Sequence, residues 1–247
     1  MKIIHAVWEK RNLGVDCYEL RVEDKDSWDD VRKAAAETGG DYKVLRIPCG
    51  RGDIFPRVSE VGYSFIETQV SCYYFLGEER FISPIQKRLM ENVRCEIMNE
   101  EDLQYCYGRI AGGLFTSERV AIDPAFSSEA AAKRFSGWIS DELERGSLMY
   151  KYLYKDKVIG FAGVSEREDG DSYNFLGATY PEYQSKGFGQ VTFLRLMEAA
   201  KKRGAKRMFT GFSMNNAGAA NMHISMGCRI DKSEYVFVRH EKQGCGQ

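Results

Sequence analysis

The sequence has few of the residues and patterns that mark common metal sites and disulfide frameworks. Among its 247 residues are three histidines and seven cysteines, and no pair of cysteines shows the CxxC spacing. The odd number and wide spacing of the cysteines exclude a disulfide framework, and no zinc-ligand spacing is present. We therefore expect no bound metal, and scattered buried thiols in the reducing environment of the cytoplasm.

Long apolar runs and an excess of one charge are also missing. No run approaches the roughly 20 apolar residues needed to cross a bilayer, and the N-terminal residues 1–14 lack the apolar core of a signal peptide. Thirty-five basic residues against 36 acidic residues give a net charge of −1. This balance disfavours a general nucleic-acid binder or a protein that binds an anionic membrane. We expect a globular cytoplasmic protein with no membrane span and no nucleic-acid partner.

The first ninety residues are predicted to form a smaller α/β domain, residues 1–90. Alternating apolar positions predict strands at 2–8, 17–22, 42–47 and 63–75, with helices at 28–38 and 54–61. Ser27 is a good N-cap for the first helix, because Asp29 and Asp30 follow it in the first turn. No catalytic constellation is visible in this part.

The remaining residues, 91–247, are predicted to form the catalytic domain. Its expected strands are at 93–98, 148–154, 158–165, 173–180, 207–213 and 235–238. Its expected helices begin at Glu100 and at Ser127 or Ser128, and two more lie at 190–203 and 216–226. The order is one strand, two helices, three strands, and then helix, strand, helix and strand.

The chemically informative segment is the loop Tyr180-Pro-Glu-Tyr-Gln-Ser-Lys-Gly-Phe-Gly-Gln190. It lies between a predicted strand and a predicted helix. Gly187 and Gly189 allow the backbone to approach a ligand, and the helix adds its positive N-terminal end, so the loop suits a pyrophosphate. A Walker loop is absent, and Thr192 replaces the third glycine of a dinucleotide fingerprint. A plain tight turn between strand and helix stays open as the alternative.

The pattern Gln-x-x-Gly-x-Gly after a strand and a Pro-Glu-Tyr turn resembles the acyl-CoA loop of the GNAT superfamily of N-acetyltransferases. The segment from Asn216 to Cys228 is similar to another stretch of that family, and the order of elements from residue 93 to 238 also matches. The resemblance implies a GNAT fold of the α/β (α+β) class. Such a fold has a mixed, mostly antiparallel sheet flanked by helices.

The resemblance also implies a function and the residues that carry it. Acetyl-CoA would be the co-substrate, and a primary amine would attack it directly in a ternary complex. The CoA-binding residues implied by the family pattern are Gly177, Ala178, Thr179, Gln184, Ser185, Lys186, Gly187, Phe188, Gly189 and Asn216. The first three would face the pantetheine arm, residues 184–189 the pyrophosphate, and Asn216 the arm near the thioester.

His223 stands where the family places a tyrosine that protonates the leaving thiolate, and it is the predicted catalytic residue. A tyrosine has a pKa of about 10 and donates a proton directly, whereas a histidine, near 6.5, must first be charged or must donate as neutral imidazole. It serves as the acid only if a neighbour raises its pKa. A packing role for His223 stays open. No general base is evident among Glu166, Asp169 and Asp171 at the preceding turn.

A second resemblance concerns the acceptor. The stretch from Pro56 to Val70, and the segment from Glu118 to Ile139, are similar to regions of the TDP-fucosamine acetyltransferase type of GNAT, in which a partial GNAT domain precedes the catalytic one. This implies an amino sugar nucleotide as acceptor, and a homodimer is common among such proteins. Two alternatives stay open: a non-catalytic acyl-CoA-binding or sensing module, and a nucleotide-binding enzyme of another class.

Overall fold

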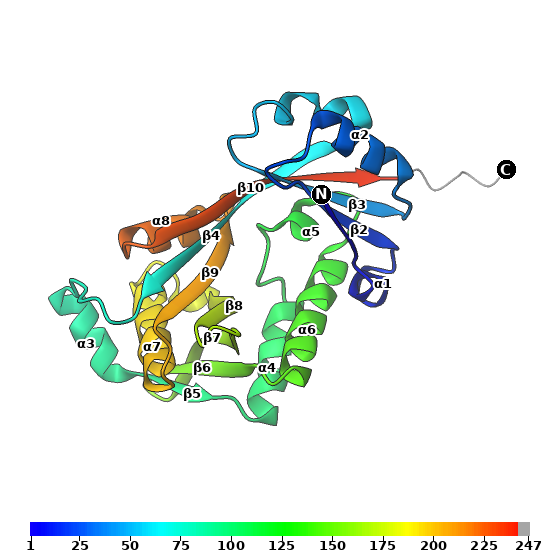
Figure 1. The fold of residues 1–247 in the computed structure, drawn as a ribbon. Helices are drawn as coiled ribbons and strands as arrows, with labels where there is room; N and C mark the ends of the chain where they lie inside the picture. Colours follow the sequence, from blue (N-terminus) through cyan, green and yellow to red (C-terminus); the bar gives the residue numbers. More distant parts are fainter. Residues whose placement is uncertain (242–247) are drawn as a thin grey trace.

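Ten strands form one continuous sheet in the computed structural model, which describes residues 1–241 (Figure 1). The strands are β1 Lys2–His5, β2 Cys17–Arg21, β3 Tyr42–Pro48, β4 Ser64–Phe75, β5 Val93–Ile97, β6 Leu148–Tyr154, β7 Lys157–Glu166, β8 Ser172–Thr179, β9 Arg207–Ser213 and β10 Arg229–His240. Their order across the sheet is β1-β2-β3-β10-β4-β9-β8-β7-β6-β5. Cys245, one of the cysteines expected to be a buried thiol, lies outside the described residues.

The helices alternate with these strands. They are α1 Trp8–Leu13, α2 Trp28–Glu37, η1 Phe55–Val61, α3 Pro84–Asn92, α4 Glu100–Ala111, α5 Arg119–Ile122, α6 Ser128–Glu144, η2 Pro181–Tyr183, α7 Phe188–Lys202 and α8 Ala217–Ser225. Ser27 caps α2 in a capping box, as its position in the sequence predicted. No helix within residues 1–241 combines the length and apolarity needed to span a bilayer.

Two expectations at the ends of the chain were wrong. The strand predicted at 2–8 ends at His5, and α1 follows it. The last strand, predicted at 235–238, runs from Arg229 to His240, because β10 pairs with β3 on one side and with β4 on the other. Polar residues such as Lys232 and Glu234 hide this strand in the sequence, since it is pairing with β4, and from Glu234 onward also with β3, that satisfies its backbone groups.

Smaller differences concern helix type and extent. The segment at 54–61 is a 3₁₀-helix, η1, rather than an α-helix, and the linker around residues 77–90 contains α3. The short helix α5 had no counterpart among the expected elements. Helix α7 starts at Phe188, two residues before its predicted start.

Helices cover both faces of the sheet. Apolar side chains of α7, including Val191 and Leu196, pack with Tyr152 and Ile159 on one face. On the opposite face, α4 and α6 pack against Met149 and Phe161. Successive residues of a strand point to opposite faces, which is why Met149 and Tyr150 belong to different cores. Figure 1 shows α6 beside α1, close to the N-terminal strands.

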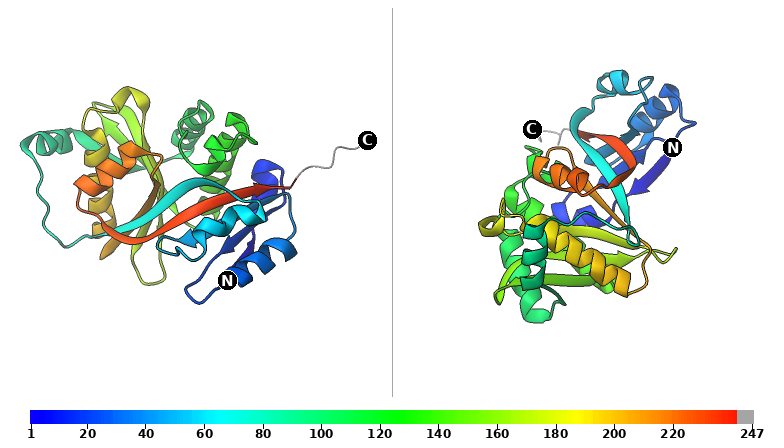
Figure 2. Two further views of the ribbon diagram at one scale, coloured as in Figure 1. Left: turned by 90° about the horizontal axis from the view of Figure 1, so that it is seen from above. Right: turned by 90° about the vertical axis from the view of Figure 1, so that its left-hand side faces the viewer.

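The strand pairing repeats around the centre of the sheet. In the N-terminal part, β1 is antiparallel to β2, and β2 is parallel to β3. In the C-terminal part, β7 is antiparallel to β8, and β8 is parallel to β9. The long strands β4 and β10 each pair with the other part of the chain. Strand β4 of the N-terminal part pairs with β9, β10 of the C-terminal part pairs with β3, and the two strands pair with each other (Figure 2). The sheet therefore continues across the boundary predicted near residue 90.

Candidate active site

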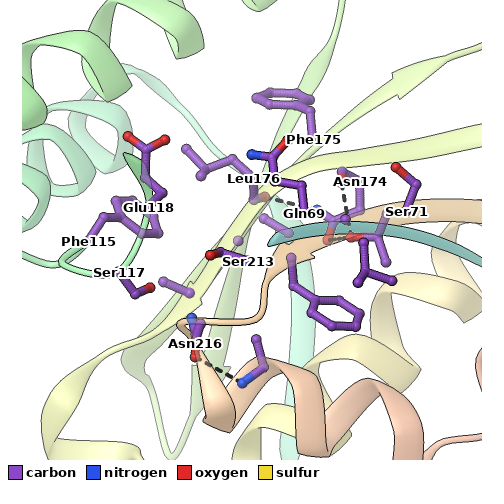
Figure 3. A pocket seen from close by; sticks show the side chains of 18 of the residues that line it. Gln69, Ser71, Phe115, Ser117, Glu118, Asn174, Phe175, Leu176, Ser213 and Asn216 are labelled. Carbon is purple, nitrogen blue, oxygen red and sulfur yellow. Dashed lines mark hydrogen bonds between the residues drawn. The ribbon is translucent and has the colours of Figure 1, made fainter. Parts of the chain in front are cut away.

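A single cleft of about 1330 Å³ is lined by residues from both ends of the sheet. One end is formed by the loop at residues 184–189, the separated ends of β8 and β9, and α8. The other end is formed by α1, β2, β3 and the part of α6 from Arg134 to Asp141. Figure 3 shows the middle of the cleft, where Phe115, Ser117 and Glu118 come from one loop and Asn174, Leu176 and Ser213 from the sheet.

Strands β8 and β9 separate at the cleft. Their parallel pairing extends from Ser172 opposite Met208 to Asn174 opposite Thr210, while β8 continues to Thr179 and β9 to Ser213. Backbone groups of Gly177 and Thr179 that would otherwise bond to β9 face the gap, because β8 pairs with β7 only on its other side.

Asn174 fixes the point where the strands part. Its side-chain amide donates hydrogen bonds to the carbonyl oxygens of Gly163 and Leu176, both at 2.9 Å. The pairing of β7 with β8 shifts register next to Asn174, between Gly163 and Val164. Asn174 is buried, and this irregularity turns β8 away from β9. The sequence carried no signal for this role of Asn174.

The loop before α7 has the backbone geometry of an anion site. Ser185 and Gly187 are left-handed, with φ of +59° and +82°. Gly187 is the N-cap of α7 and supplies no side-chain cap, so no side chain of the cap competes for the first N–H groups of the helix. Alternating left-handed residues and a helix N-terminus both direct N–H groups toward an anion. The loop thus has the geometry expected of a site for an anion such as a pyrophosphate.

Gly189 is needed for a second reason. A Cβ placed on it would lie 3.3 Å from the Met222 sulfur of α8. The start of α7 therefore packs closely on α8. Gln184 closes the other side of the loop by donating to the Thr179 carbonyl oxygen at 2.9 Å.

Most of the predicted CoA-binding residues line the cleft. Those that do are Gly177, Ala178, Thr179, Gln184, Ser185, Gly187, Gly189 and Asn216. Lys186 and Phe188 do not: Lys186 donates to the Glu182 carbonyl oxygen, and Phe188 is buried beside Tyr154. That Lys186 and Phe188 contact CoA stays a prediction, and such contacts would be made by their backbone N–H groups.

His223 also lines the cleft, on α8, with its ring stacked on Phe212 at 5.3 Å between ring centres. Its Nδ1 lies 2.9 Å from the Tyr74 hydroxyl, which also lies 3.2 Å from the His223 carbonyl oxygen. Burial lowers the pKa of the imidazole to about 4, because the charged form loses its hydration. This shift favours the neutral imidazole near pH 7, and the catalytic role of His223 stays a prediction.

Asn216 has a structural task as well as its place in the cleft. Its side-chain oxygen accepts a hydrogen bond from the Ala219 N–H at 3.0 Å and so caps α8, the helix that carries His223. Tyr74, the partner of His223, was not singled out as a site residue. It lies in a β-rich run of aromatic residues, where nothing distinguishes it from a core tyrosine.

The end of the cleft near the N-terminus is charged, and we call the group Glu9, Glu19, Arg46, Arg119 and Arg134 the charged arm. All five line the cleft, and Arg134 is the only one that is not buried. Arg119 and Arg134 both approach Glu9 Oε1, at 3.3 and 2.8 Å. Sequence reasoning missed this arm, since its members come from five separate segments.

A metal site is not part of this arrangement. Over residues 1–241, no three His, Cys, Asp or Glu side chains gather in a way that would hold an ion. The six cysteines in that range are free thiols, and Cys17, Cys72 and Cys106 are buried.

Comparisons with known proteins agree with this geometry. Residues 114–227 match the acetyltransferase (GNAT) family. A search of curated proteins found no match.

Solved structures show similarity at low sequence identity. The chain is similar to a GCN5-related N-acetyltransferase from Sphaerobacter thermophilus, with a TM-score of 0.59 and 12% identity over 81% of this chain, and it spans 59% of that protein. A conserved protein of unknown function from Staphylococcus epidermidis has a TM-score of 0.62 and 10% identity, and the similarity covers 91% of this chain and 84% of that protein. A tandem GNAT protein from the clavulanic acid biosynthesis pathway has a TM-score of 0.51 and 11% identity, and the similarity covers 86% of this chain and 68% of that protein. The chain therefore has a GNAT fold, as the sequence resemblance implied.

Proposed function

We propose that this chain, whose residues 114–227 form a GNAT acetyltransferase domain, transfers an acetyl group from acetyl-CoA to a primary amine. The observation that carries the proposal is the meeting of two features in one cleft. The unpaired edge of β8 suits an extended amide-bearing arm, and the left-handed loop before α7 suits a pyrophosphate. Acetyl-CoA has both parts in one molecule.

The binding roles follow from these positions. Backbone groups of Gly177, Ala178 and Thr179 would pair with the pantetheine amides. Backbone N–H groups from Gln184 to Gly189 would hold the pyrophosphate, with Ser185 and Gly187 already in the required conformation. Asn216 would contact the arm near the thioester, at the start of α8.

The chemistry is direct acyl transfer. A neutral amine forms a nitrogen–carbon bond to the acetyl carbonyl, the carbon–sulfur bond breaks, and one proton leaves the nitrogen for the departing sulfur. The chain holds the two substrates in line, which supplies much of the rate, and backbone N–H groups stabilise charge on the carbonyl oxygen. His223, neutral at pH 7, would donate a hydrogen bond to the sulfur, with its ring held by Tyr74.

We further propose that residues 1–90 are a partial GNAT domain, with residues 91–247 the catalytic one. Two observations support this: the β1–β2–β3 pairing repeats the β7–β8–β9 pairing, and one similar structure is a tandem GNAT protein. An amino sugar nucleotide is the acceptor that the sequence resemblance favours. A cytoplasmic homodimer is the accompanying expectation.

A non-catalytic acyl-CoA-binding module is the second candidate. The observation that favours it is the buried, neutral His223 at the position of the expected acid. Turnover of any amine decides against it.

Calorimetric titration with acetyl-CoA, CoA and ATP tests the proposal. We expect micromolar binding of acetyl-CoA and no binding of ATP. A panel of amines, followed by release of free CoA thiol, then tests transfer. Binding of acetyl-CoA without turnover of any amine supports the second candidate, and ATP binding without CoA binding overturns both.

A further inference from the structure

The charged arm contains two places where two arginines share one carboxylate oxygen. At the first, Arg119 and Arg134 approach Glu9 Oε1. At the second, Arg46 and Arg21 approach Glu19 Oε1, at 2.9 and 2.5 Å. The nearest further carboxylates are more distant: Glu118 lies 3.5 Å from Arg134, and Glu234 lies 3.7 Å from Arg46.

Several of these buried groups have unused hydrogen-bonding capacity. Arg119 is 4% exposed, and within residues 1–241 its Nε has no hydrogen-bond partner. The same part of the chain offers no hydrogen-bond partner to Glu118 Oε1. A guanidinium has five N–H donors, and leaving buried donors unsatisfied is unfavourable. Arg119 and Glu118 both line the cleft, so a ligand bound there lies beside these two side chains.

The signs of the charges restrict that ligand. Four arginines, Arg21, Arg46, Arg119 and Arg134, face four carboxylates, those of Glu9, Glu19, Glu118 and Glu234. These eight side chains, the arm with its neighbours Arg21, Glu118 and Glu234, balance in formal charge, so the region suits a ligand with both charges better than a bare cation. Guanidinium forks bind carboxylate and phosphate oxygens, and Glu118 stands nearer the middle of the cleft, next to Phe115 and Ser117 (Figure 3).

We propose that the charged arm is the acceptor-recognition site, and that it binds an anionic group, a carboxylate or a phosphate, on the molecule that carries the amine. The guanidinium groups of Arg119 and Arg134 hold the anion, and the Glu118 carboxylate attracts the ammonium form of the amine before it is neutralised. This inference rests on the proposed acetyltransferase function and adds the charge class of its substrate.

Matched amines test this charge class. Ethanolamine, O-phosphoethanolamine and β-alanine share a two-carbon spacer and differ in the group beyond it: hydroxyl, phosphate or carboxylate. Glucosamine and glucosamine 1-phosphate form a second pair. Binding is measured by calorimetry on the acetyl-CoA-loaded protein, and kcat/KM by thiol release.

We expect at least one anionic compound to bind ten times more tightly than its neutral counterpart. A preference for phosphate alone or carboxylate alone identifies the source of the anion. Equal binding of neutral and anionic amines, on a protein that binds acetyl-CoA, overturns the inference and leaves the proposed function intact. Failure of acetyl-CoA to bind overturns the proposed function instead.

Two variants assign the effect to the arm. Arg119→Lys keeps the charge but removes the fork, and Arg134→Gln removes a charge at a partly exposed position, so it keeps the test valid if the first variant fails to fold. Both should reduce the preference for the anionic compound about tenfold and leave acetyl-CoA affinity unchanged. Arg32→Gln, on an exposed pair with Asp29 and outside the cleft lining, is the matched control. An unchanged preference in a folded Arg134→Gln variant overturns the assignment.

Discussion

The two ends of the cleft present different chemical groups, backbone at one end and side chains at the other. At the loop before α7, the groups that face the cleft are largely backbone N–H and C=O groups, set by Ser185, Gly187 and the separation of β8 from β9. At the charged arm they are side chains, and Arg134 and Glu9 are 125 residues apart in the sequence. A backbone site can be specified by a short local motif, whereas a side-chain site requires tertiary assembly.

This difference has a consequence for specificity. A loop that binds through its backbone can keep the same ligand while most of its side chains change. The charged arm can change its ligand through one or two substitutions. The comparison predicts that variants of the arm alter stability and acceptor choice, and that variants of the loop alter acetyl-CoA binding.

The largest expected effect is on stability at the charged arm. Glu9→Leu removes the carboxylate shared by Arg119 and Arg134 and leaves two guanidiniums without it, which should lower the free energy of unfolding by about 3 to 5 kcal/mol. Urea unfolding measures the change. Glu60→Leu, at an exposed ion pair, should change it by less than about 1 kcal/mol. Equal effects of the two substitutions would show that the arm does not hold α1 in place.

The next effect concerns His223 on α8, at the same end of the cleft as the loop before α7. The pKa of its imidazole is about 4 in the folded chain and about 6.5 in an unfolded chain. Between these two pH values the unfolded chain therefore binds a proton at His223 that the folded chain does not bind. The contribution of His223 to stability is present above pH 6.5 and is lost as pH falls toward 4, by about 3 kcal/mol.

Urea unfolding between pH 4.5 and 7 tests this dependence. His223→Gln should flatten the pH dependence, while His5→Gln, at a ring that is 47% exposed, should leave it close to that of the parent. The same slope in all three proteins would contradict the burial of a neutral imidazole.

The third effect is on the backbone end alone. Gly187→Glu puts a side chain where φ is +82° and a carboxylate where the pyrophosphate is expected, so acetyl-CoA affinity should fall at least about 100-fold, or about 2.7 kcal/mol. Gly170→Glu, at a φ of +79° with open space around it and outside the cleft, carries the same backbone strain without the site. Unchanged affinity in the folded Gly187 variant would refute the loop assignment.

The smallest effect separates binding from turnover. His223→Ala should lower kcat about tenfold, which is less than the roughly 100-fold minimum for a general acid, because a neutral ring donates only a hydrogen bond. It should change acetyl-CoA affinity by less than a factor of about 3. Tyr74→Phe, which removes the partner of Nδ1, should shift kcat in the same direction by less. Steady-state kinetics with calorimetry measures both quantities. Equal kcat for His223→Ala and the parent would assign His223 to packing.

The local elements were predictable because their signals are local. Ser27 and Asn99 each cap a helix that begins at the next residue, and Gly187 precedes α7. Helix α1 was not predicted, and the strand expected at 2–8 ran into its first residue, because no local signal marks Trp8–Leu13 as a helix. Its Glu9 is instead held by Arg119 and Arg134, and Gly137 of α6 leaves room for the Asn12 side chain, since a Cβ there would lie 2.3 Å from Asn12 Oδ1.

By itself, the sequence determined the order of most strands, the glycine loop before α7 and the resemblance to GNAT proteins, because each depends on residues that are neighbours along the chain. Only the tertiary structure decided that β4 lies between β9 and β10, that Tyr74 holds His223, and that four arginines meet four carboxylates at the far end of the cleft. Strand order, desolvation and long-range ion pairs arise from contacts between distant segments, and a single sequence does not display those contacts.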